Sequence, residues 1–495
     1  MENRNSEITW SDYVRAERFL PWNLEKRIYN AEVTPQWIGK EEEKPEKFWY
    51  LNKARHGKEF MICDPERELH ERSFDHVRLA AGLSVASGKQ CTHGKLPFDV
   101  IDWVDGNRVR FKVDETYWEC DLDTYECCQV EHEKKKKPGE LLSPDEKWAA
   151  FRKDFNIYLR NTESGEELQL TEDGEKYFDY GFFPESNTYA VTFRPHISRI
   201  PPMAIWSKDS KKLVTQRLDQ RRVKDLHLLQ SCPPEGQRPV LHAYRYAMVG
   251  DSELTKCEVV ILDVDKKKTV FADLGQFEID FMGPVEQKHL WWAEDNQKVY
   301  LALFERAYKS VRLYEIDAET GKSRVLMEET GETYVELAPL LGTRPNVSII
   351  KQGEELIWHS ERDGWANLYR YNAGNGELIN QITSGPFVVW EIKHVDEEGD
   401  WIYFMGGARE PDRDPYYLHL YRVKLDGTDL QLLTPQDAHH KVTFSPGGKY
   451  FVDTYSRVDA APVTELRSCD DSQVRILLQE ADISTLLEMG WREPE

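Results

Sequence analysis

The chain has 495 residues and a formal net charge of −23; aromatic residues make up 12% of it, and 15 residues are Trp. Disordered chains do not carry this aromatic content, so we expect an ordered protein. The negative charge argues against nucleic-acid partners, whose phosphates require clustered Lys and Arg. No run approaches the roughly 18 apolar residues of a membrane span, so we expect no membrane partner either.

Targeting and cysteine content favour a cytoplasmic protein. The first 30 residues lack the apolar segment of a secretory signal. The eight Cys residues form no CxxC pair, which argues against a zinc knuckle or a disulfide framework and favours reduced, mostly buried thiols. No motif predicts a cofactor or a metal, and the basic run at 134–137 is best interpreted as a solvated loop. The Cys positions are 63, 91, 120, 127, 128, 232, 257 and 469.

The two ends of the chain are predicted to be helical. Residues 9–28 form a helical pattern with Thr9 or Ser11 as N-cap and Pro21 as an interruption, so we assign 1–40 to an N-terminal helical extension. At the other end, Asp482 is positioned to cap a short helix that Gly490 ends. We assign 481–495 to this helix, with Leu486, Leu487 and Trp491 exposed, and interpret it as a connector to a further domain.

A repeated pattern fills the chain between these ends. Each copy has a polar turn, short strands of alternating polarity and a second turn of the Asp-x-x-x-Gly kind. Copies recur at roughly 40–65 residues, the longer gaps carrying insertions, and four strands in such a unit are typical of a β-propeller. We therefore predict an all-β propeller over 41–480 with eight four-stranded blades, seven being the alternative. The copies begin at Phe48, Val104, Ser143, Trp206, Trp291, Lys351, Glu397 and Ser445.

Three segments carry a family resemblance. They are SPDEKWAAFRKDFNIYLRN from Ser143, HSERDGWANLYRY from His359, and LTPQDAHHKVTFSPGGKYFVDTYSRVDAAPVTELR from Leu433. They resemble the N-terminal propeller of bacterial dipeptidyl peptidase IV-like serine peptidases of the prolyl oligopeptidase family. The resemblance implies a following α/β-hydrolase domain with the Ser-Asp-His triad. It also implies a propeller that limits access to the active site and holds the N-terminus of a peptide substrate.

The hydrolase motif itself is absent from the sequence. A nucleophile elbow needs G-x-S-x-G, in which the Gly residues allow the tight strand-to-helix turn. The nearest string, Gly82-Leu-Ser84-Val-Ala86, ends in Ala and follows no buried strand. We therefore predict no catalytic residue and no peptidase activity for this chain by itself, with the α/β-hydrolase domain supplied by a longer product or a separate subunit.

The substrate-binding residues are predicted from the resemblance. Dipeptidyl peptidases of the family carry a Glu-Glu pair on a short helical insertion, whose carboxylates bind the free amine of the peptide. The corresponding stretch here offers only Glu185, with Asp179 or Tyr180 nearby; the alternative is an exposed loop Glu after Pro184. Exopeptidase and endopeptidase specificity therefore both stay open.

Three further features have ordinary structural interpretations. Arg362 is a weaker substrate-binding candidate, because Asp363-Gly364 next to it is a hairpin signal that favours a conformational role. The segment from Pro195 is expected to be a rigid, extended insertion that lines a cavity or crosses a blade edge. His439 and His440 are expected in an inter-blade loop, since adjacent residues of a strand face opposite sides and cannot share a metal.

These observations predict the substrate-gating and substrate-binding propeller of a serine peptidase. Its partners would be a peptide and an α/β-hydrolase domain, and a homodimer is left open. The alternative is a stand-alone propeller that binds proteins or peptides as a scaffold without peptidase activity.

Overall fold

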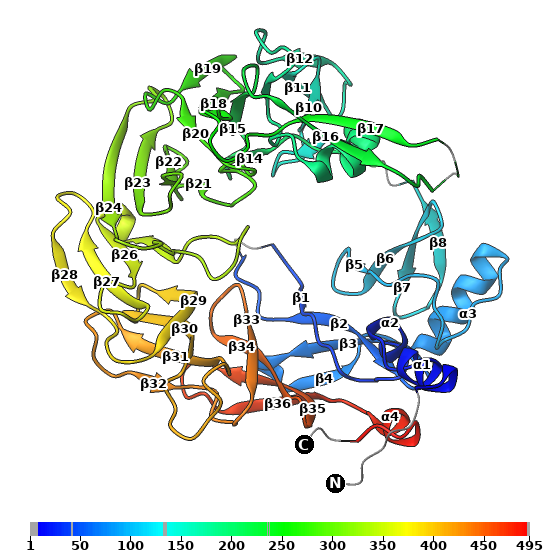
Figure 1. Ribbon diagram of the computed structural model, residues 1–495. Helices are drawn as coiled ribbons and strands as arrows, with labels where there is room; N and C mark the ends of the chain where they lie inside the picture. Colours follow the sequence, from blue (N-terminus) through cyan, green and yellow to red (C-terminus); the bar gives the residue numbers. More distant parts are fainter. Residues whose placement is uncertain (1–7, 41–42, 132–135, 235, 237, 493–495) are drawn as a thin grey trace. The chain divides into compact units, whose positions relative to one another are not determined.

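A computed structural model describes residues 8–40, 43–131, 136–234, 236 and 238–492 (Figure 1). The described residues form eight antiparallel sheets, seven of four strands and one of six, together with a two-stranded hairpin. The chain divides into two compact units, Met1–His132 with Gly385–Glu495 (unit 1) and Glu133–Ser384 (unit 2). Each unit contains four of the sheets.

Unit 1 holds the first two and the last two sheets of the sequence. The first sheet consists of β1 (Gln36–Trp37), β2 (Phe48–Ala54), β3 (Gly57–Asp64) and β4 (Leu69–Arg72). The second consists of β5 (Asp102–Trp103), β6 (Arg108–Val113), β7 (Thr116–Asp121) and β8 (Cys127–Val130). The last two consist of β29 (Val388–Asp396), β30 (Trp401–Gly407), β31 (His419–Lys424) and β32 (Gln431–Leu432), and of β33 (His439–Phe444), β34 (Tyr450–Arg457), β35 (Ala460–Ser468) and β36 (Val474–Glu480).

Unit 2 holds the four middle sheets. The first comprises β9 (Leu141–Leu142), β10 (Trp148–Lys153), β11 (Asn156–Asn161) and β12 (Glu167–Gln169). The six-stranded sheet comprises β13 (Phe178–Tyr180), β14 (Ala204–Trp206), β15 (Lys212–Asp219), β18 (Lys256–Asp263), β19 (Lys268–Phe271) and β20 (Phe277–Glu278), and the hairpin β16 (Asp225–Gln230) and β17 (Val240–Arg245) interrupts it. The remaining two sheets comprise β21 (Leu290–Trp292), β22 (Lys298–Phe304), β23 (Ser310–Asp317) and β24 (Ser323–Thr330), and β25 (Val347–Ile350), β26 (Glu355–Ser360), β27 (Asn367–Asn372) and β28 (Leu378–Gln381).

One turn type recurs between the third and fourth strands of several sheets. At Asp121, Asn161, Asp317 and Asn372, the side-chain oxygen accepts hydrogen bonds from the amides two and three residues further on. Such Asx turns explain why an Asp or Asn begins the hairpin. Three of the four turns then use a Gly with positive φ, and the turn after Asp121 uses Tyr125 (φ 62°). The local turn chemistry that predicted the repeats is confirmed.

Apolar side chains pack the sheets onto one another within each unit. The first and last sheets of unit 1 share a buried cluster that includes Phe48 and Tyr50 from β2 and Val452 and Leu466 from β34 and β35. The Tyr50 hydroxyl adds a polar link, since it accepts from Gln479 Nε2 at 2.8 Å. The two ends of the sheet-forming sequence are therefore joined by direct side-chain packing.

The sheet count and strand order give the fold class: an eight-bladed β-propeller of mostly four-stranded antiparallel blades, as the sequence predicted. Within the described residues, no helix has the length and apolar character to cross a membrane.

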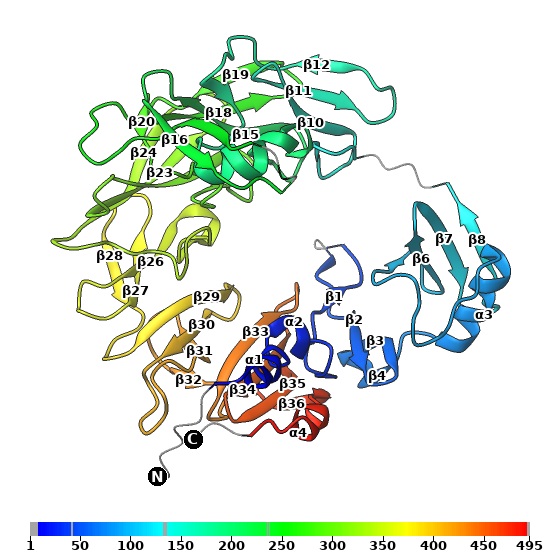
Figure 2. The ribbon, with the colours of Figure 1, turned by 45° about the vertical axis from the view of Figure 1, so that its right-hand side comes forward.

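Helices are few and short. They are α1 (Trp10–Glu17), α2 (Pro21–Leu24), α3 (His76–Ser87) and α4 (Ser484–Glu488). Thr9 caps α1 together with Asp12, and Pro21 starts α2 as a separate turn. Figures 1 and 2 show α1, α2 and α4 close together, and the backbone of Tyr29 bonds that of Asp482 in both directions at 3.2 and 2.8 Å. The first sheet strand, Gln36–Trp37, lies inside the range assigned to the helical extension.

Several local expectations need correction. Leu486 is 5% exposed and packs inward, whereas Leu487 is 54% exposed as expected. The segment from Pro195 is not extended, because Arg194–Arg199 forms a 3-10 helix. His439 and His440 lie in strand β33 rather than in a loop, and His440 is buried against Asp453, with Nδ1 2.8 Å from Oδ1. Sequence patterns also missed α3, whose residues include the Gly82–Ala86 string; Ser84 donates to the Ala80 carbonyl as helical Ser residues do.

Replacement of Leu466 tests the packing between the first and last sheets. Leu466→Ala leaves a cavity at a fully buried position and should lower the free energy of unfolding of unit 1 by about 2–5 kcal/mol. The matched control is Leu477→Ala on β36, since Leu477 is 48% exposed. Denaturant unfolding followed by Trp fluorescence measures both. Equal midpoints for the two variants would contradict the assignment of this cluster as a joint.

Candidate functional site

The candidate site lies where one strand of the six-stranded sheet is interrupted. β13 and β14 both pair with β15, at Tyr180↔Arg217 and Ala204↔Thr215, so they form one edge of the sheet in two pieces. The residues between them, 181–203, leave the sheet and include a π-helical turn at Tyr189–Phe193 and the 3-10 helix Arg194–Arg199. We call residues 181–203 the insertion. All of the predicted amine-binding residues lie on it or directly before it.

Glu185, near the start of the insertion, is held by hydrogen bonds to other residues of unit 2. Its Oε2 accepts a 2.6 Å hydrogen bond from the Arg245 amide of β17, and its Oε1 accepts a 3.4 Å contact from Arg194 Nη2. Its backbone amide donates to Gln220 Oε1 at 3.2 Å. Burial raises the pKa of Glu185, partly offset by the Arg245 amide and by the charges of Arg194 and Arg245. Oε1 thus keeps acceptor capacity, while Oε2 ties the insertion to the hairpin.

Asp179 forms a buried ion pair beneath Glu185. Arg152 Nη2 of β10 donates to Asp179 Oδ2 at 2.9 Å, and Arg152 Nε donates to the Tyr180 carbonyl at 3.0 Å. Burial raises the pKa of Asp179 to about 6, against the Arg152 charge, and the nearby Glu185 charge raises it further. The charge of each carboxylate therefore affects the other, and both are balanced by the guanidinium groups of nearby Arg residues.

The Tyr180 side chain points to a different network. Its hydroxyl donates to Asp173 Oδ1 at 2.6 Å and accepts from Arg217 Nη1 at 3.1 Å. Burial and the Asp173 bond both raise the pKa of this phenol. Tyr180 therefore lies next to Asp179 in sequence but contributes its carbonyl, not its hydroxyl, to the Arg152 contact.

Aromatic side chains fix the insertion. Phe182, Phe183 and Tyr189 form a separate small cluster, in which the Phe182 and Phe183 rings are 4.1 Å apart. The Arg152 guanidinium lies over the Phe182 ring at 3.7 Å, and that of Arg194 lies over Tyr189 at 5.1 Å. Such cation–π contacts orient both guanidinium groups around the two carboxylates.

A buried amide links the insertion to the following loop. Gln216 Nε2 donates to the Phe182 carbonyl at 2.7 Å, and Gln216 Oε1 accepts from the Val285 amide at 3.3 Å. Glu286 in the same loop accepts from the Gly283 amide at 2.6 Å and also from Gln216. Burial raises the pKa of Glu286 to about 7. This carboxyl group has no cationic partner among the described residues.

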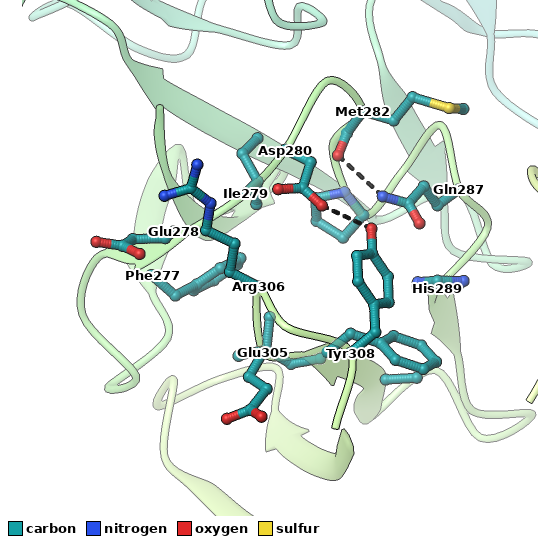
Figure 3. Close-up of a pocket in the computed structure, with 14 residues that line it drawn as sticks. Phe277, Glu278, Ile279, Asp280, Met282, Gln287, His289, Glu305, Arg306 and Tyr308 are labelled. Carbon is teal, nitrogen blue, oxygen red and sulfur yellow. Dashed lines mark hydrogen bonds between the residues drawn. The ribbon is translucent and has the colours of Figure 1, made fainter. Parts of the chain in front are cut away.

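The pocket beside this loop is too small for a peptide. Figure 3 shows Tyr308 pointing to Asp280, whose Oδ2 accepts its hydroxyl at 2.7 Å, and Gln287 bonded to the Met282 carbonyl at 3.0 Å. The enclosed volume is about 40 Å³, which is room for a few water molecules. We interpret it as a joint between the loop and the β22–β23 hairpin.

Arg362 lies away from the insertion. It donates to Ser360 Oγ at 2.8 Å and to Glu329 Oε2 of the neighbouring sheet at 3.1 Å, and its guanidinium lies over Tyr369 at 4.3 Å. It lines a cleft of about 690 Å³ together with Glu336. The structure thus groups Glu185 with Asp179, and it groups neither Arg362 nor the Tyr180 hydroxyl with them.

Sequence reasoning did not identify Arg194, Gln220 or Arg245 as partners of Glu185, or Arg152 as the partner of Asp179. Arg152 comes from another sheet, and Gln220 and Arg245 come from later parts of the chain, so no local spacing reveals them. Arg194 is only nine residues after Glu185, but the segment that follows it was expected to be extended rather than helical.

Comparison with known proteins identifies the family. The sequence model of the family described as "Dipeptidyl peptidase IV (DPP IV) N-terminal region" matches residues 100–183 and 199–462. The chain belongs to this family. The unmatched residues between these stretches, 184–198, are those that carry Glu185 and Arg194.

Individual relatives agree with this assignment. Probable dipeptidyl-aminopeptidase B of Talaromyces marneffei is 26% identical over 402 residues, and the match covers 75% of this chain and 42% of that protein. The Talaromyces stipitatus protein of the same name is 24% identical, with 70% and 39% covered. Porphyromonas gingivalis dipeptidyl peptidase 4 has a TM-score of 0.60 at 16% identity, with 96% of this chain and 62% of that chain covered, which shows a shared fold. The chain thus spans about two fifths of the length of these curated relatives.

Glu286 gives the site a testable pH dependence. Because its pKa is raised from 4.5 to about 7 in the folded state, its contribution to stability is complete below about pH 4.5 and is lost as the pH rises through 7. Glu286→Gln should flatten this fall and raise stability well above pH 7 by about 3 kcal/mol. Thermal or urea unfolding across this range measures it. Glu278→Gln, at an exposed position on β20, is the control, and parallel pH profiles for wild type and Glu286→Gln would refute the assignment.

Proposed function

We propose that this chain is the substrate-gating and substrate-binding propeller of a dipeptidyl-peptidase-IV-like serine peptidase. The supporting observation is the family match on both sides of residues 184–198, combined with an insertion at that point that presents a partly buried carboxylate. Propellers of this family pair with α/β-hydrolase domains, so such a domain, in the same product or as a separate subunit, is the proposed partner. A cytoplasmic location is part of the proposal.

The proposed binding role of Glu185 rests on its unfilled acceptor capacity. An α-ammonium group at Oε1 would replace the 3.4 Å contact with Arg194 by a short, charge-assisted hydrogen bond. Oε2 would stay bonded to the Arg245 amide and keep the carboxylate oriented. The preference for an ammonium over a neutral, blocked N-terminus then rests on the Glu185 charge itself, because Asp179 is paired with Arg152. A free N-terminus held in this way would limit how far a peptide reaches toward a reacting centre.

Burial also links amine binding to pH. Because burial raises the pKa of Glu185, the carboxyl group binds an ammonium only after it has lost its proton. Affinity for free-amine peptides is therefore expected to rise with pH over the acid range.

The first test concerns the chain alone. With no nucleophile elbow in its sequence, the 495-residue chain should release no p-nitroaniline from aminoacyl-prolyl p-nitroanilides. The same chain joined to, or mixed with, an α/β-hydrolase domain encoded in the same gene or beside it should do so. Turnover by the chain alone would contradict the proposal, and absence of turnover from every such combination would favour the scaffold alternative.

The second test concerns the amine site in the active combination. Glu185→Gln keeps an oxygen for the Arg245 amide but removes the charge, so KM for free-amine substrates should rise about tenfold or more. KM for N-acetylated peptides and kcat should change little. Glu172→Gln, at an exposed position before β13, is the matched control. An equal rise in KM for free and acetylated substrates would show that Glu185 only supports the fold.

A further inference from the structure

Two cysteines face each other across one hairpin of unit 1. Cys120 on β7 and Cys127 on β8 are direct partners in the antiparallel register. Direct partners project from the same face of a sheet, and here both side chains belong to the core beneath α3. Cys128 follows Cys127 and therefore projects from the opposite face, where it is exposed.

The hydrogen-bond pattern gives this pair the shorter of the two Cα spacings of an antiparallel ladder. The Asp121 amide donates to the Glu126 carbonyl at 3.2 Å, so Asp121–Glu126 is a hydrogen-bonded pair and Cys120–Cys127 is the next, non-hydrogen-bonded one. Residues in such pairs have Cα atoms about 4.5 Å apart, at the short end of the range that a disulfide bridges. The two thiols are near enough for each to shift the pKa of the other.

The hairpin turn does not require cysteine at these positions. The other sheets with this turn have Ile316↔Ser323, Arg160↔Glu167 and Tyr371↔Leu378 at the same place. The paired thiols are thus a property of this one blade rather than of the repeat.

The surroundings distinguish the two sulfurs. Cys120 is fully buried, whereas Cys127 is partly exposed. The neighbouring Cys120 thiol lowers the pKa of the Cys127 thiol, while Cys127 and burial raise the pKa of Cys120. Cys127 is the more exposed of the two and has the lower thiol pKa, which assigns it as the attacking nucleophile, and Cys120 is placed to resolve its adducts.

We propose that Cys120 and Cys127 form a reversible redox site that takes small-molecule disulfides such as oxidised glutathione. The Cys127 thiolate attacks the disulfide, forms a mixed disulfide and releases one thiol. Cys120 then loses its proton and attacks the Cys127 sulfur, which releases the second thiol. The net change converts two protein thiols and one small disulfide into the Cys120–Cys127 disulfide and two small thiols.

The Cys120–Cys127 disulfide would link the edge strand β8 covalently to its neighbour β7. β8 is the last strand of unit 1 before the unit boundary at His132–Glu133, and α3 packs across it, with Arg78 Nη2 donating to the Asp123 carbonyl at 3.0 Å. Oxidation would therefore fix β8 to β7 at the point where the chain leaves unit 1.

Oxidised glutathione provides the test. The folded chain is incubated with it, alkylated and mapped by mass spectrometry. We expect a Cys120–Cys127 linkage, two fewer alkylated thiols, slower hydrogen exchange of β8 amides and full reversal by dithiothreitol. A Cys127–Cys128 linkage, or unreacted Cys120 and Cys127 while Cys128 is modified, would overturn the proposal.

Variants separate the two steps. Cys120→Ser should trap glutathione on Cys127, and Cys120→Ala provides the same readout if the Ser variant unfolds, which circular dichroism reports. Cys128→Ser is the matched control and should still form the Cys120–Cys127 bond. A folded Cys120 variant without an adduct on Cys127 would disprove the assigned order of attack.

Discussion

The central strands of the blades are buried on both faces, and the rest of the structure depends on that burial. On β18 and β26 nearly every residue is inaccessible, so each sheet must be covered by a neighbour on either side. Apolar clusters between neighbouring sheets provide this cover. In unit 2 they join each sheet to the next, from β9–β12 to β25–β28, and in unit 1 one of them joins the first sheet to the last. A repeat that packs only against its neighbours tolerates change at its hairpins and edges, because those residues contribute little to the shared core.

The predictable part of the fold is the part encoded locally. Asx turns such as those at Asp317 and Asn372, flanked by alternating strands, predict hairpins because every determinant lies within about ten residues. The errors have tertiary causes. Leu79 and Leu83 stabilise helix α3 by burial in the core over strands β7 and β8, and its weak periodicity alone does not reveal it. His440 belongs to a strand because β33 pairs with β34, where Asp453 meets its ring; this partner lies thirteen residues away, and no turn or spacing rule indicates it.

In the candidate site too, the sequence indicates the residues but not the tertiary contacts around them. Glu185 and Asp179 were predictable from a family resemblance, since the stretch between them and Trp206 departs from the repeat. Their electrostatic surroundings were not, because Arg152 reaches Asp179 from β10 and Arg245 reaches Glu185 from β17. The resemblance therefore identifies a candidate carboxylate, whereas its protonation and its orientation are set by residues that only folding brings together.

The insertion and the cysteine hairpin show how one repeated unit acquires different chemistry. In the six-stranded sheet, the edge strand is interrupted, so residues 181–203 leave the ladder without disturbing Tyr180↔Arg217 or Ala204↔Thr215 on either side. In the second sheet the ladder is intact, and Cys120 and Cys127 occupy one of its non-hydrogen-bonded pairs. Both changes leave the inter-sheet clusters in place. The family match continues on both sides of the insertion for the same reason: selection on the core constrains the strands, while residues that contribute little to it are free to specialise.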